Sequence, residues 1–278
     1  MKKTSMMLPI LTTTLTLLPV TPTPAQLISP SPRTLAQVDL LTEPSTLNFV
    51  PPSLPDRGRP TGRSEGGASR GSCNIAGQPP LTALIPVEET VGTSETSDRS
   101  QQLTTLPESV FSLTTKEQPS FWFYVPYPLD TTPLEFVLQD DKNNTLYQGR
   151  FIGQTNVDGI VQVTLPDTAP KLQQNETYHW FFLAYCDQDN PSFVEGWTAR
   201  SPLSPALSQA LSTATTREQA RLYAENGIWQ ETLTIAGESY RANPNTPELA
   251  TDWTSLLESA NLSQLGEIQL VPCCSPVE

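Results

Sequence analysis

His179 is the only histidine in the chain, and histidine is the residue type most often used for acid–base chemistry. It lies between Tyr178 and Trp180 in an aromatic run. A nucleophile activated by histidine also needs an orienting carboxylate, and the sequence contains no G-x-S-x-G or comparable nucleophile motif. We therefore predict that His179 is an ordinary strand residue on an outer face, and that no residue of the chain is catalytic.

Acidic residues suggest two further kinds of chemistry. Residues 187–190, DQDN, resemble the start of a calcium loop, but Ser192 replaces the glycine expected at the sixth position. Thr198 stands at the twelfth position, where a bidentate acid is expected, so a turn is the better interpretation. A hydrolase with a pair of carboxylates remains an alternative, although no pair among the 29 acids stands out. We expect no metal site and no cofactor.

Cys73, Cys186, Cys273 and Cys274 are the four cysteines. An even number in an exported chain indicates disulfides, and the lack of paired C-x-x-C spacing argues against zinc. A bond between adjacent Cys273 and Cys274 would close a small, strained ring. We therefore expect each of them to pair with Cys73 or Cys186, in either combination, which would tie the C-terminal tail to the first domain.

Two aromatic segments, residues 121–127 and 178–186, are apolar at both odd and even positions. A sandwich strand with one solvent-facing side should instead alternate with polar residues. These strands are therefore predicted to be covered on both sides, while any face left open would be a binding patch. Trp122, Tyr124 and Trp197 are the predicted ligand or partner contacts on such a face.

The 278 residues carry a net charge of -13, and only 37% of them are hydrophobic. With 16 Lys and Arg, the chain lacks the cationic surface that nucleic-acid binding requires. The low apolar fraction indicates disordered segments that dilute a normally apolar domain.

The N-terminus begins Met1-Lys2-Lys3 and then runs uncharged to residue 32. This order predicts a signal peptide over residues 1–25, with cleavage possible as late as residue 36. No second long apolar run exists, so the mature chain is predicted not to span a membrane. We expect an exported protein, periplasmic or extracellular.

Four further segments follow the predicted signal. Residues 26–72, rich in Pro, Ser, Gly and Arg, predict a disordered linker. Residues 73–200 have the rhythm of a β-sandwich, residues 201–262 that of a helical module, and residues 263–278 form a tail with the cysteine pair. The predicted strands are 81–85, 120–127, 134–140, 146–152, 159–165, 177–186 and 193–200. Residues 87–118, polar and rich in Thr and Ser, predict a long loop or irregular edge.

Two local patterns refine this fold class, which is mostly β with a C-terminal α part. Leu172, six residues before Tyr178, resembles the tyrosine corner of immunoglobulin-like and fibronectin-like β-sandwiches. In the helical module, a capping box formed by Thr215 and Glu218 opens a helix that stops at Asn226-Gly227. That helix and the next, about residues 228–242, look like one tetratricopeptide unit, and one unit cannot build a superhelical groove. Flanking helices are predicted near residues 203–211 and from residue 246 onward.

Six blocks spread along the chain resemble one known family. They are FWFYVPY at 121–127, YHWFF at 178–182, VEGW at 194–197, LSP at 203–205, YAENGIW at 223–229 and VPCC at 271–274. Together they resemble the cyanobacterial family known only as domain of unknown function 928, over roughly residues 66–274. The resemblance implies an exported cyanobacterial protein and supplies no catalytic residues.

These observations favour a non-enzymatic interaction module of the cell envelope that contacts another protein. The alternative is a carbohydrate-binding β-sandwich in which exposed aromatic residues stack on a glycan. A hydrolase with unidentified carboxylates is the third hypothesis.

Overall fold

The computed structural model describes residues 46–52, 61–66, 73, 75–88 and 109–276. The predicted signal peptide, most of the predicted linker and residues 89–108 of the predicted loop lie outside the described residues. Residues 43–278 form one compact unit, and the description below concerns that unit.

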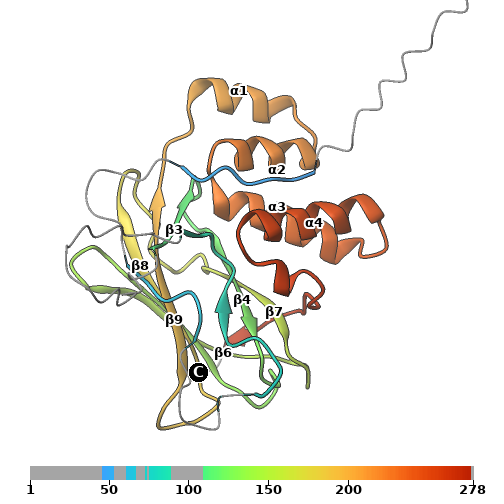
Figure 1. Ribbon diagram of the computed structural model, residues 1–278. Coiled ribbons are helices and arrows are strands. Elements are labelled where there is room, and N and C mark those ends of the chain that lie inside the picture. The colour runs from blue at the N-terminus through green and yellow to red at the C-terminus, as the bar shows by residue number, and fades with distance from the viewer. Residues whose placement is uncertain (1–45, 53–60, 67–72, 74, 89–108, 277–278) are drawn as a thin grey trace, which may run out of the picture. The chain divides into compact units, whose positions relative to one another are not determined.

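The unit is mostly β, with four helices near its C-terminus, as predicted (Figure 1). A small sheet has the order β1–β4–β7, and its strands are Thr82–Ala83, Ser120–Val125 and Gly159–Thr164. A large sheet has the order β10–β6–β5–β8–β9–β3–β2. Its strands, in that order, are Ser275–Pro276, Thr145–Ile152, Leu134–Gln139, Thr177–Ala184, Ser192–Arg200, Ser109–Thr114 and Val87–Glu88.

Aromatic side chains fill the space between the two sheets. Phe123 of β4 stacks on Phe182 of β8 with ring centroids 3.9 Å apart, and Phe121 meets Phe136 of β5 at 4.8 Å. Along β8 every second residue is buried, as a strand with one core-facing side requires. The backbone N–H of Gln173 donates to the Tyr178 hydroxyl at 2.7 Å. The likeness to immunoglobulin or fibronectin domains stays a prediction.

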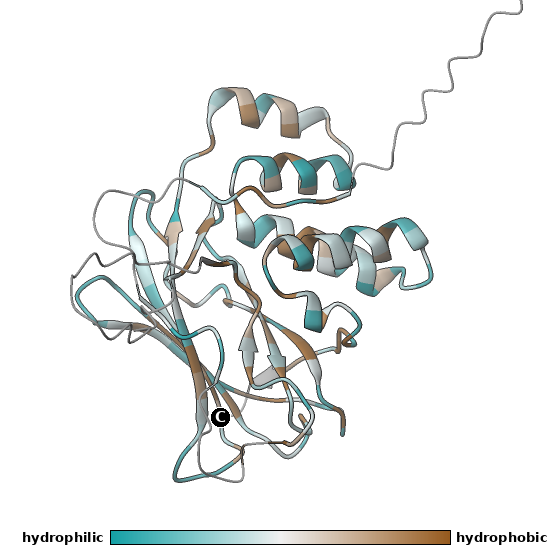
Figure 2. Cartoon of the chain, in the orientation of Figure 1, coloured by the Kyte–Doolittle hydropathy of each residue, from teal (hydrophilic) through white to brown (hydrophobic). Residues whose placement is uncertain are grey.

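The helices are α1 (Pro205–Thr213), α2 (Thr216–Glu225), α3 (Trp229–Ala242) and α4 (Pro247–Ser259). The capping box of Thr215 and Glu218 opens α2 as predicted, and Gly227, with φ of 70°, ends its last turn in the left-handed conformation that glycine tolerates. Figure 2 shows α2 as largely hydrophilic, and only two alanines of that helix are buried. The tetratricopeptide likeness of α2 and α3 stays a prediction.

Helix α3 covers the outer face of the small sheet. Trp122 of β4 donates from Nε1 to Thr234 Oγ1 at 3.2 Å, and its ring lies against Gly237. Trp229, at the start of α3, donates from Nε1 to the Leu84 carbonyl at 2.8 Å. The prediction of coverage on both faces is therefore confirmed for β4 and wrong for β8, in which alternate residues are partly exposed.

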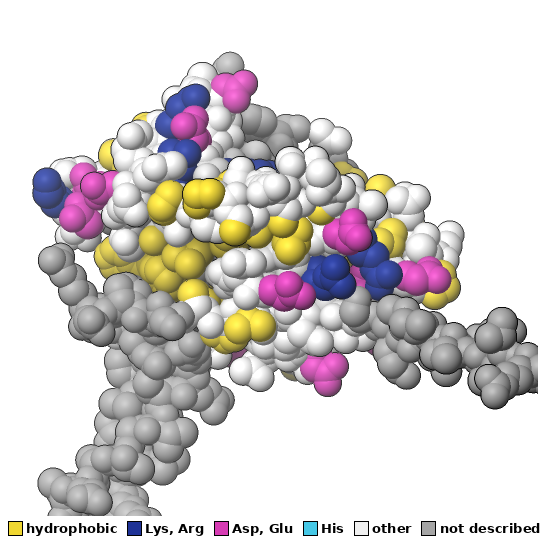
Figure 3. Space-filling model, turned by 90° about the horizontal axis from the view of Figure 1, so that it is seen from above, with side chains coloured by type: hydrophobic (Ala, Val, Ile, Leu, Met, Phe, Trp, Pro, Cys, Tyr) yellow, Lys and Arg dark blue, Asp and Glu magenta, His cyan; other side chains and the backbone are white. Residues whose placement is uncertain are grey.

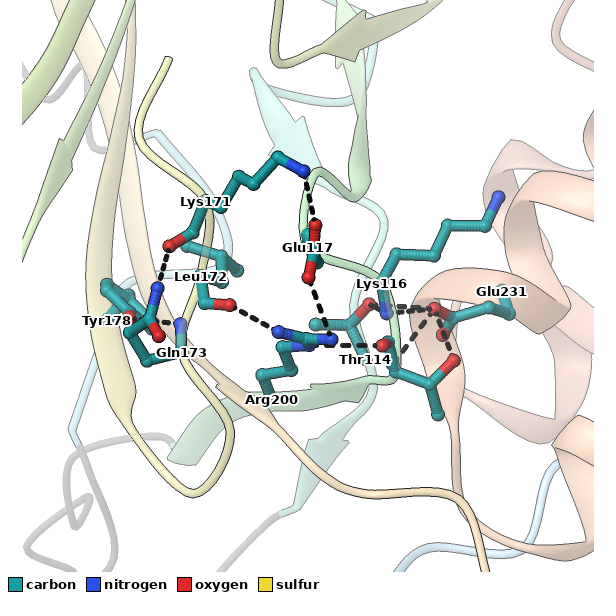
Figure 4. A network of polar contacts seen from close by, with 10 residues as sticks. Thr114, Lys116, Glu117, Lys171, Leu172, Gln173, Tyr178, Arg200 and Glu231 are labelled. Carbon is teal, nitrogen blue, oxygen red and sulfur yellow. Dashed lines mark hydrogen bonds and ion pairs between the residues drawn. The ribbon is translucent and has the colours of Figure 1, made fainter. Parts of the chain in front are cut away.

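A buried carboxylate fixes the start of α3 to the end of β3 (Figure 4). Glu231 Oε1 accepts from Thr114 Oγ1 at 2.8 Å, from the backbone N–H of Thr115 at 2.9 Å and from that of Lys116 at 3.0 Å. The Thr115 hydroxyl donates to the same oxygen at 3.1 Å. Nearby, Arg200 donates to the carbonyls of Thr115 and Leu172, which joins the ends of β3 and β9 to the turn before β8.

The prediction for residues 87–118 is a long loop or an irregular edge, and strand β3 corrects the loop alternative, because β3 and β2 lie at one edge of the large sheet. Strand β3 pairs in parallel with β9, and Phe111 lies opposite Trp197. Its pattern is inverted: Ser112 and Thr114 face inward, while Phe111 and Leu113 are partly exposed. Ser112 and Thr114 can be buried because Gln230 and Glu231 of α3 form hydrogen bonds with them. A sequence pattern that assigns only apolar residues to the inner face does not predict such a strand.

Two pieces of the predicted linker are ordered, so the expectation of disorder is wrong for them. Residues 46–52, which we name the strap, lie along α2, and their Leu47 and Phe49 are buried (Figure 1). Residues 61–66 form isolated β-bridges, including Arg63 with Glu195 of β9. The alternating apolar residues of this Pro-rich segment are enough to hold it in a groove of the folded unit.

The disulfide pairing also differs from the prediction. Cys73 is bonded to Cys186, so neither of them is available to pair with Cys273 or Cys274. The tail is therefore not tied to the first domain through sulfur; instead β10 pairs with β6, and Val271 bonds the Ile160 carbonyl. In the described part of the chain, none of the helices has the length and hydropathy needed to cross a bilayer.

Candidate functional site

The outer face of the large sheet carries an apolar strip that we name the sheet-face patch. Its members are partly exposed and come from four adjacent strands. They are Phe111 and Leu113 of β3, Val137 of β5, Phe181 and Leu183 of β8, and Phe193 and Trp197 of β9. The strand registers place several of them side by side, because Phe181 is opposite Val137, Leu183 is opposite Phe193 and Trp197 is opposite Phe111. A solvent-facing side of a sheet is ordinarily polar. This apolar strip is therefore the candidate binding surface of the molecule.

His179 and Trp197 form a stacked pair within the patch. Their ring centroids are 4.2 Å apart and the ring planes differ by 4°. His179 Nε2 lies 3.1 Å from Glu195 Oε2, and Trp197 Nε1 donates to the Thr61 carbonyl at 3.1 Å. Burial lowers the pKa of His179, against the opposing effect of Glu195. Trp197 Nε1 is thus bonded to the preceding segment and His179 Nε2 lies near the Glu195 carboxylate, an arrangement that agrees with the predicted outer-face position of His179.

Arg63 borders the patch from the segment that precedes β1. Its guanidinium carbon lies 4.6 Å above the centroid of the Phe193 ring. Its backbone exchanges two hydrogen bonds of 2.9 Å with Glu195. The patch therefore has one cation stacked on an aromatic ring and one carboxylate beside an imidazole at its rim.

A buried acid lies on the same face of β5. Glu135 accepts from the Tyr185 hydroxyl at 2.7 Å, from Arg150 Nε at 3.1 Å and from the Gln148 amide. Burial raises the pKa of Glu135, but the hydrogen bonds from Tyr185 and Gln148 and the charge of Arg150 outweigh it and lower the pKa overall. This cluster contains a single, stably ionised carboxylate, whereas glycoside hydrolysis uses a pair in two protonation states.

Of the three predicted contact residues, only Trp197 lies on an accessible face. Trp122 is 2% exposed and Tyr124 0% exposed, because α3 and the C-terminal segment cover the small sheet. The Tyr124 hydroxyl donates to Asp158 at 3.3 Å, and burial together with Asp158 raises the pKa of Tyr124 to about 12. Trp122 and Tyr124 are therefore core residues, and their prediction as surface contacts is corrected.

Sequence reasoning missed most of the patch. Phe111 and Leu113 fall in the segment predicted as a long loop or irregular edge, and Phe181 and Leu183 belong to a strand predicted to be covered on both sides. The alternation of Phe111 and Leu113 with serine and threonine was a strand signal that the polar composition of the insert obscured.

Metal chemistry receives no support from the described residues, which contain no group of three or more His, Cys, Asp or Glu able to hold an ion. Residues 187–190, compared above with a calcium loop, form a turn in which the Asp189 N–H donates to Asp187 Oδ1 at 3.1 Å.

Comparison with known proteins gives one specific result. Residues 65–270 match the model of the family described as Domain of Unknown Function (DUF928). A search of curated proteins found no match. Among solved structures, one similar chain is a beta-glucosidase from Listeria innocua in complex with gluconolactone, with 10% identity and a TM-score of 0.20. That alignment covers 57% of this chain and only 22% of the glucosidase, and at this TM-score it supports no argument about fold or activity.

Proposed function

Since the chain belongs to the DUF928 family, whose description assigns no activity, we propose a function from its surface: an exported, non-enzymatic interaction module of the cell envelope. The sheet-face patch is its contact surface for a protein partner. The observation that supports this most is the apolar strip across four strands on a sheet side that would otherwise be polar.

The composition of the patch favours a protein partner. Aromatic residues such as Trp197 and Phe181, held rigidly by neighbours, are the usual energetic centres of protein interfaces. Arg63 and Glu195 at the rim supply charges of both signs, which set orientation more than affinity. Export rests on the N-terminal sequence, and fractionation with N-terminal sequencing of the mature chain tests it.

Carbohydrate binding is the second candidate, and Trp197 is the residue that favours it, because a partly exposed indole can stack on a sugar ring. Sugar recognition also needs free hydrogen-bonding groups around the ring. Trp197 Nε1 already donates to the Thr61 carbonyl, and His179 Nε2 is buried beside Glu195 Oε2, so neither atom is available to a sugar hydroxyl, which weakens this alternative.

The test places a photo-cross-linking amino acid at Phe181 in the full chain expressed in its host. A discrete protein adduct is expected, and it should be lost when Trp197→Ala is added. The matched control is the same cross-linker at Leu203, an apolar residue 38% exposed outside the sheets. Equal adducts at both positions, or none at Phe181, would contradict the proposal. Glycan binding that Trp197→Ala abolishes would favour the second candidate instead.

A further inference from the structure

The strap contacts the helical layer as an extended peptide contacts a protein that recognises it. Its side chains alternate: Leu47 and Phe49 are 4% and 6% exposed, while Thr46, Asn48 and Val50 point to solvent. The strap forms neither helix nor β-ladder, so its conformation is set by this surface. A short segment with two anchors and exposed residues between them is a recurrent mode of peptide recognition.

The two anchors enter a groove formed by α2, the start of α3 and α4, which we name the strap groove. The Phe49 ring meets Trp229 edge to face, with centroids 4.8 Å apart and planes at 77°. Trp229 is fully buried, so Phe49 completes an aromatic contact that closes the helical layer. Leu47 lies between α2 and α4, beside Arg217 and Asp252.

Main-chain bonds hold the strap at its second anchor and at the residue that follows it. The Phe49 N–H donates to Ser259 Oγ of α4 at 3.0 Å, and the Val50 N–H donates to the Ala224 carbonyl of α2 at 3.1 Å. Pro52 then rests on Gly227, where a Cβ atom would come within 2.9 Å of the proline Cβ. These main-chain bonds need only a peptide backbone, so the groove selects a ligand through the positions that bury the two apolar side chains, Leu47 and Phe49.

A polar cleft of about 300 Å³ continues the groove beyond Leu47. Its charges are mutually paired: Arg217 makes two bonds of 2.6 and 2.9 Å to Asp252, and Glu218 caps α2. Figure 3, which looks down on the helices, shows acidic and basic side chains next to one another on this face. The cleft therefore gives room for a longer ligand without demanding a charged one.

The strap and its groove differ in their relation to the family match. The groove residues lie within residues 65–270, whereas the strap precedes them. The ligand is thus joined to the matched region by residues 53–64 and is not part of it.

We propose that the strap groove is a recognition site for an extended, uncharged segment of another protein, in which two large apolar residues are separated by one residue. The strap is its intramolecular ligand and occupies the groove until a partner segment displaces it. This site is separate from the sheet-face patch, so either can fail without the other.

The test uses the full chain with Leu47→Ala and Phe49→Ala, which removes both anchors and leaves the groove intact. A fluorescent peptide of residues 46–52 is titrated into this variant, with fluorescence anisotropy as the readout. The peptide should bind saturably, and a peptide with alanine at both anchors should not. A tethered ligand has an effective concentration of about 1 mM, so the wild-type chain should bind the peptide at least about tenfold more weakly. Val50→Ala, which changes a side chain 53% exposed in the same segment, should behave as wild type.

Absence of binding to a folded double variant would overturn the proposal. If the double variant does not fold, the wild-type chain with a protease site within residues 53–60 is cleaved and incubated with excess labelled peptide. The peptide should then co-elute with the protein in gel filtration, and no incorporation would overturn the proposal. Heterodimers formed between the double variant and the wild-type chain would overturn the assignment to another protein in favour of strap exchange between copies.

Discussion

Replacing Glu231 tests whether the helices and the large sheet are energetically one unit. The carboxylate is 1% exposed, and its Oε1 accepts from the backbone N–H groups of Thr115 and Lys116 and from two threonine hydroxyls. In Glu231→Ala the hydroxyls can rotate to other acceptors, and the Lys116 N–H keeps its second acceptor, Thr114 Oγ1, at 3.1 Å. The Thr115 N–H loses its acceptor and the Lys116 N–H loses the charged one of its two acceptors, and bonds to a charged group contribute about 1.5–3 kcal/mol each. Glu231 Oε2 is buried and makes no hydrogen bond among the described residues. Because an unpaired buried charge destabilises the folded state, removing it offsets part of the free energy lost with the hydrogen bonds. The net loss in the free energy of unfolding should be about 2–4 kcal/mol.

Glu231→Gln separates the hydrogen bonds from the charge. The amide oxygen can still accept from Thr115 and Lys116, but bonds to a charged acceptor are about twice as strong as bonds to a neutral one. We therefore expect a smaller loss, about 1–2 kcal/mol. Glu238→Gln, which changes an exposed acid on the same helix, should stay within about 0.5 kcal/mol of wild type.

Urea unfolding followed by tryptophan fluorescence, with disulfides intact, measures these differences. A single transition with unchanged slope is expected, because both layers should unfold together. A loss below about 1 kcal/mol for the alanine variant would refute the reasoning. So would a glutamine variant more stable than wild type, because the unpartnered Oε2 charge would then outweigh the bonds.

Three further predictions follow from burial, covalent linkage and charge. Trp122→Ala should lose about 3–5 kcal/mol of stability in calorimetry, whereas Trp197→Ala should lose much less because its ring is partly exposed; equal losses would contradict the assignment of one to the core and one to the surface. Non-reducing peptide mapping should link Cys73 to Cys186, and replacing both with alanine should cost about 2–4 kcal/mol; a link from either to the C-terminal tail would contradict the pairing. Because the pKa of His179 is lowered in the folded state, the unfolded chain binds more protons, so stability should fall as pH drops below about 6.5. His179→Gln should remove that component of the pH dependence of urea midpoints, and an unchanged pH profile would contradict it.

Short-range sequence patterns predicted the strands and helices whose formation depends on neighbouring residues. All seven expected strands and all four helices form, because alternation in β5 and β7 and the Thr215 capping box act over a few residues. The doubly apolar pattern of β4 indicated coverage on both sides, which α3 provides. Family membership was also predicted correctly from separated sequence blocks.

The remaining features depend on partners far away in the chain. Ser112 and Thr114 face inward only because Gln230 and Glu231 form hydrogen bonds with them. The sequence around β3 does not reveal these distant partners. Which aromatic residues stay on the surface was likewise decided by where α3 packs, so Trp122 was misassigned while Trp197 was not. The Cys73–Cys186 bond closes a separation of 113 residues, a proximity that spacing alone does not reveal.

The Phe49–Ser259 contact has a consequence for the order in which the chain folds. The two residues are 210 positions apart, so the strap cannot find its site until α4 has been synthesised. Contacts of such separation form late because a long loop must close first. Leu47 and Phe49 are therefore exposed throughout synthesis, and a chain truncated before α4 would keep two apolar residues available to chaperones and proteases. Burial of Leu47 and Phe49 would therefore show that α4 has formed.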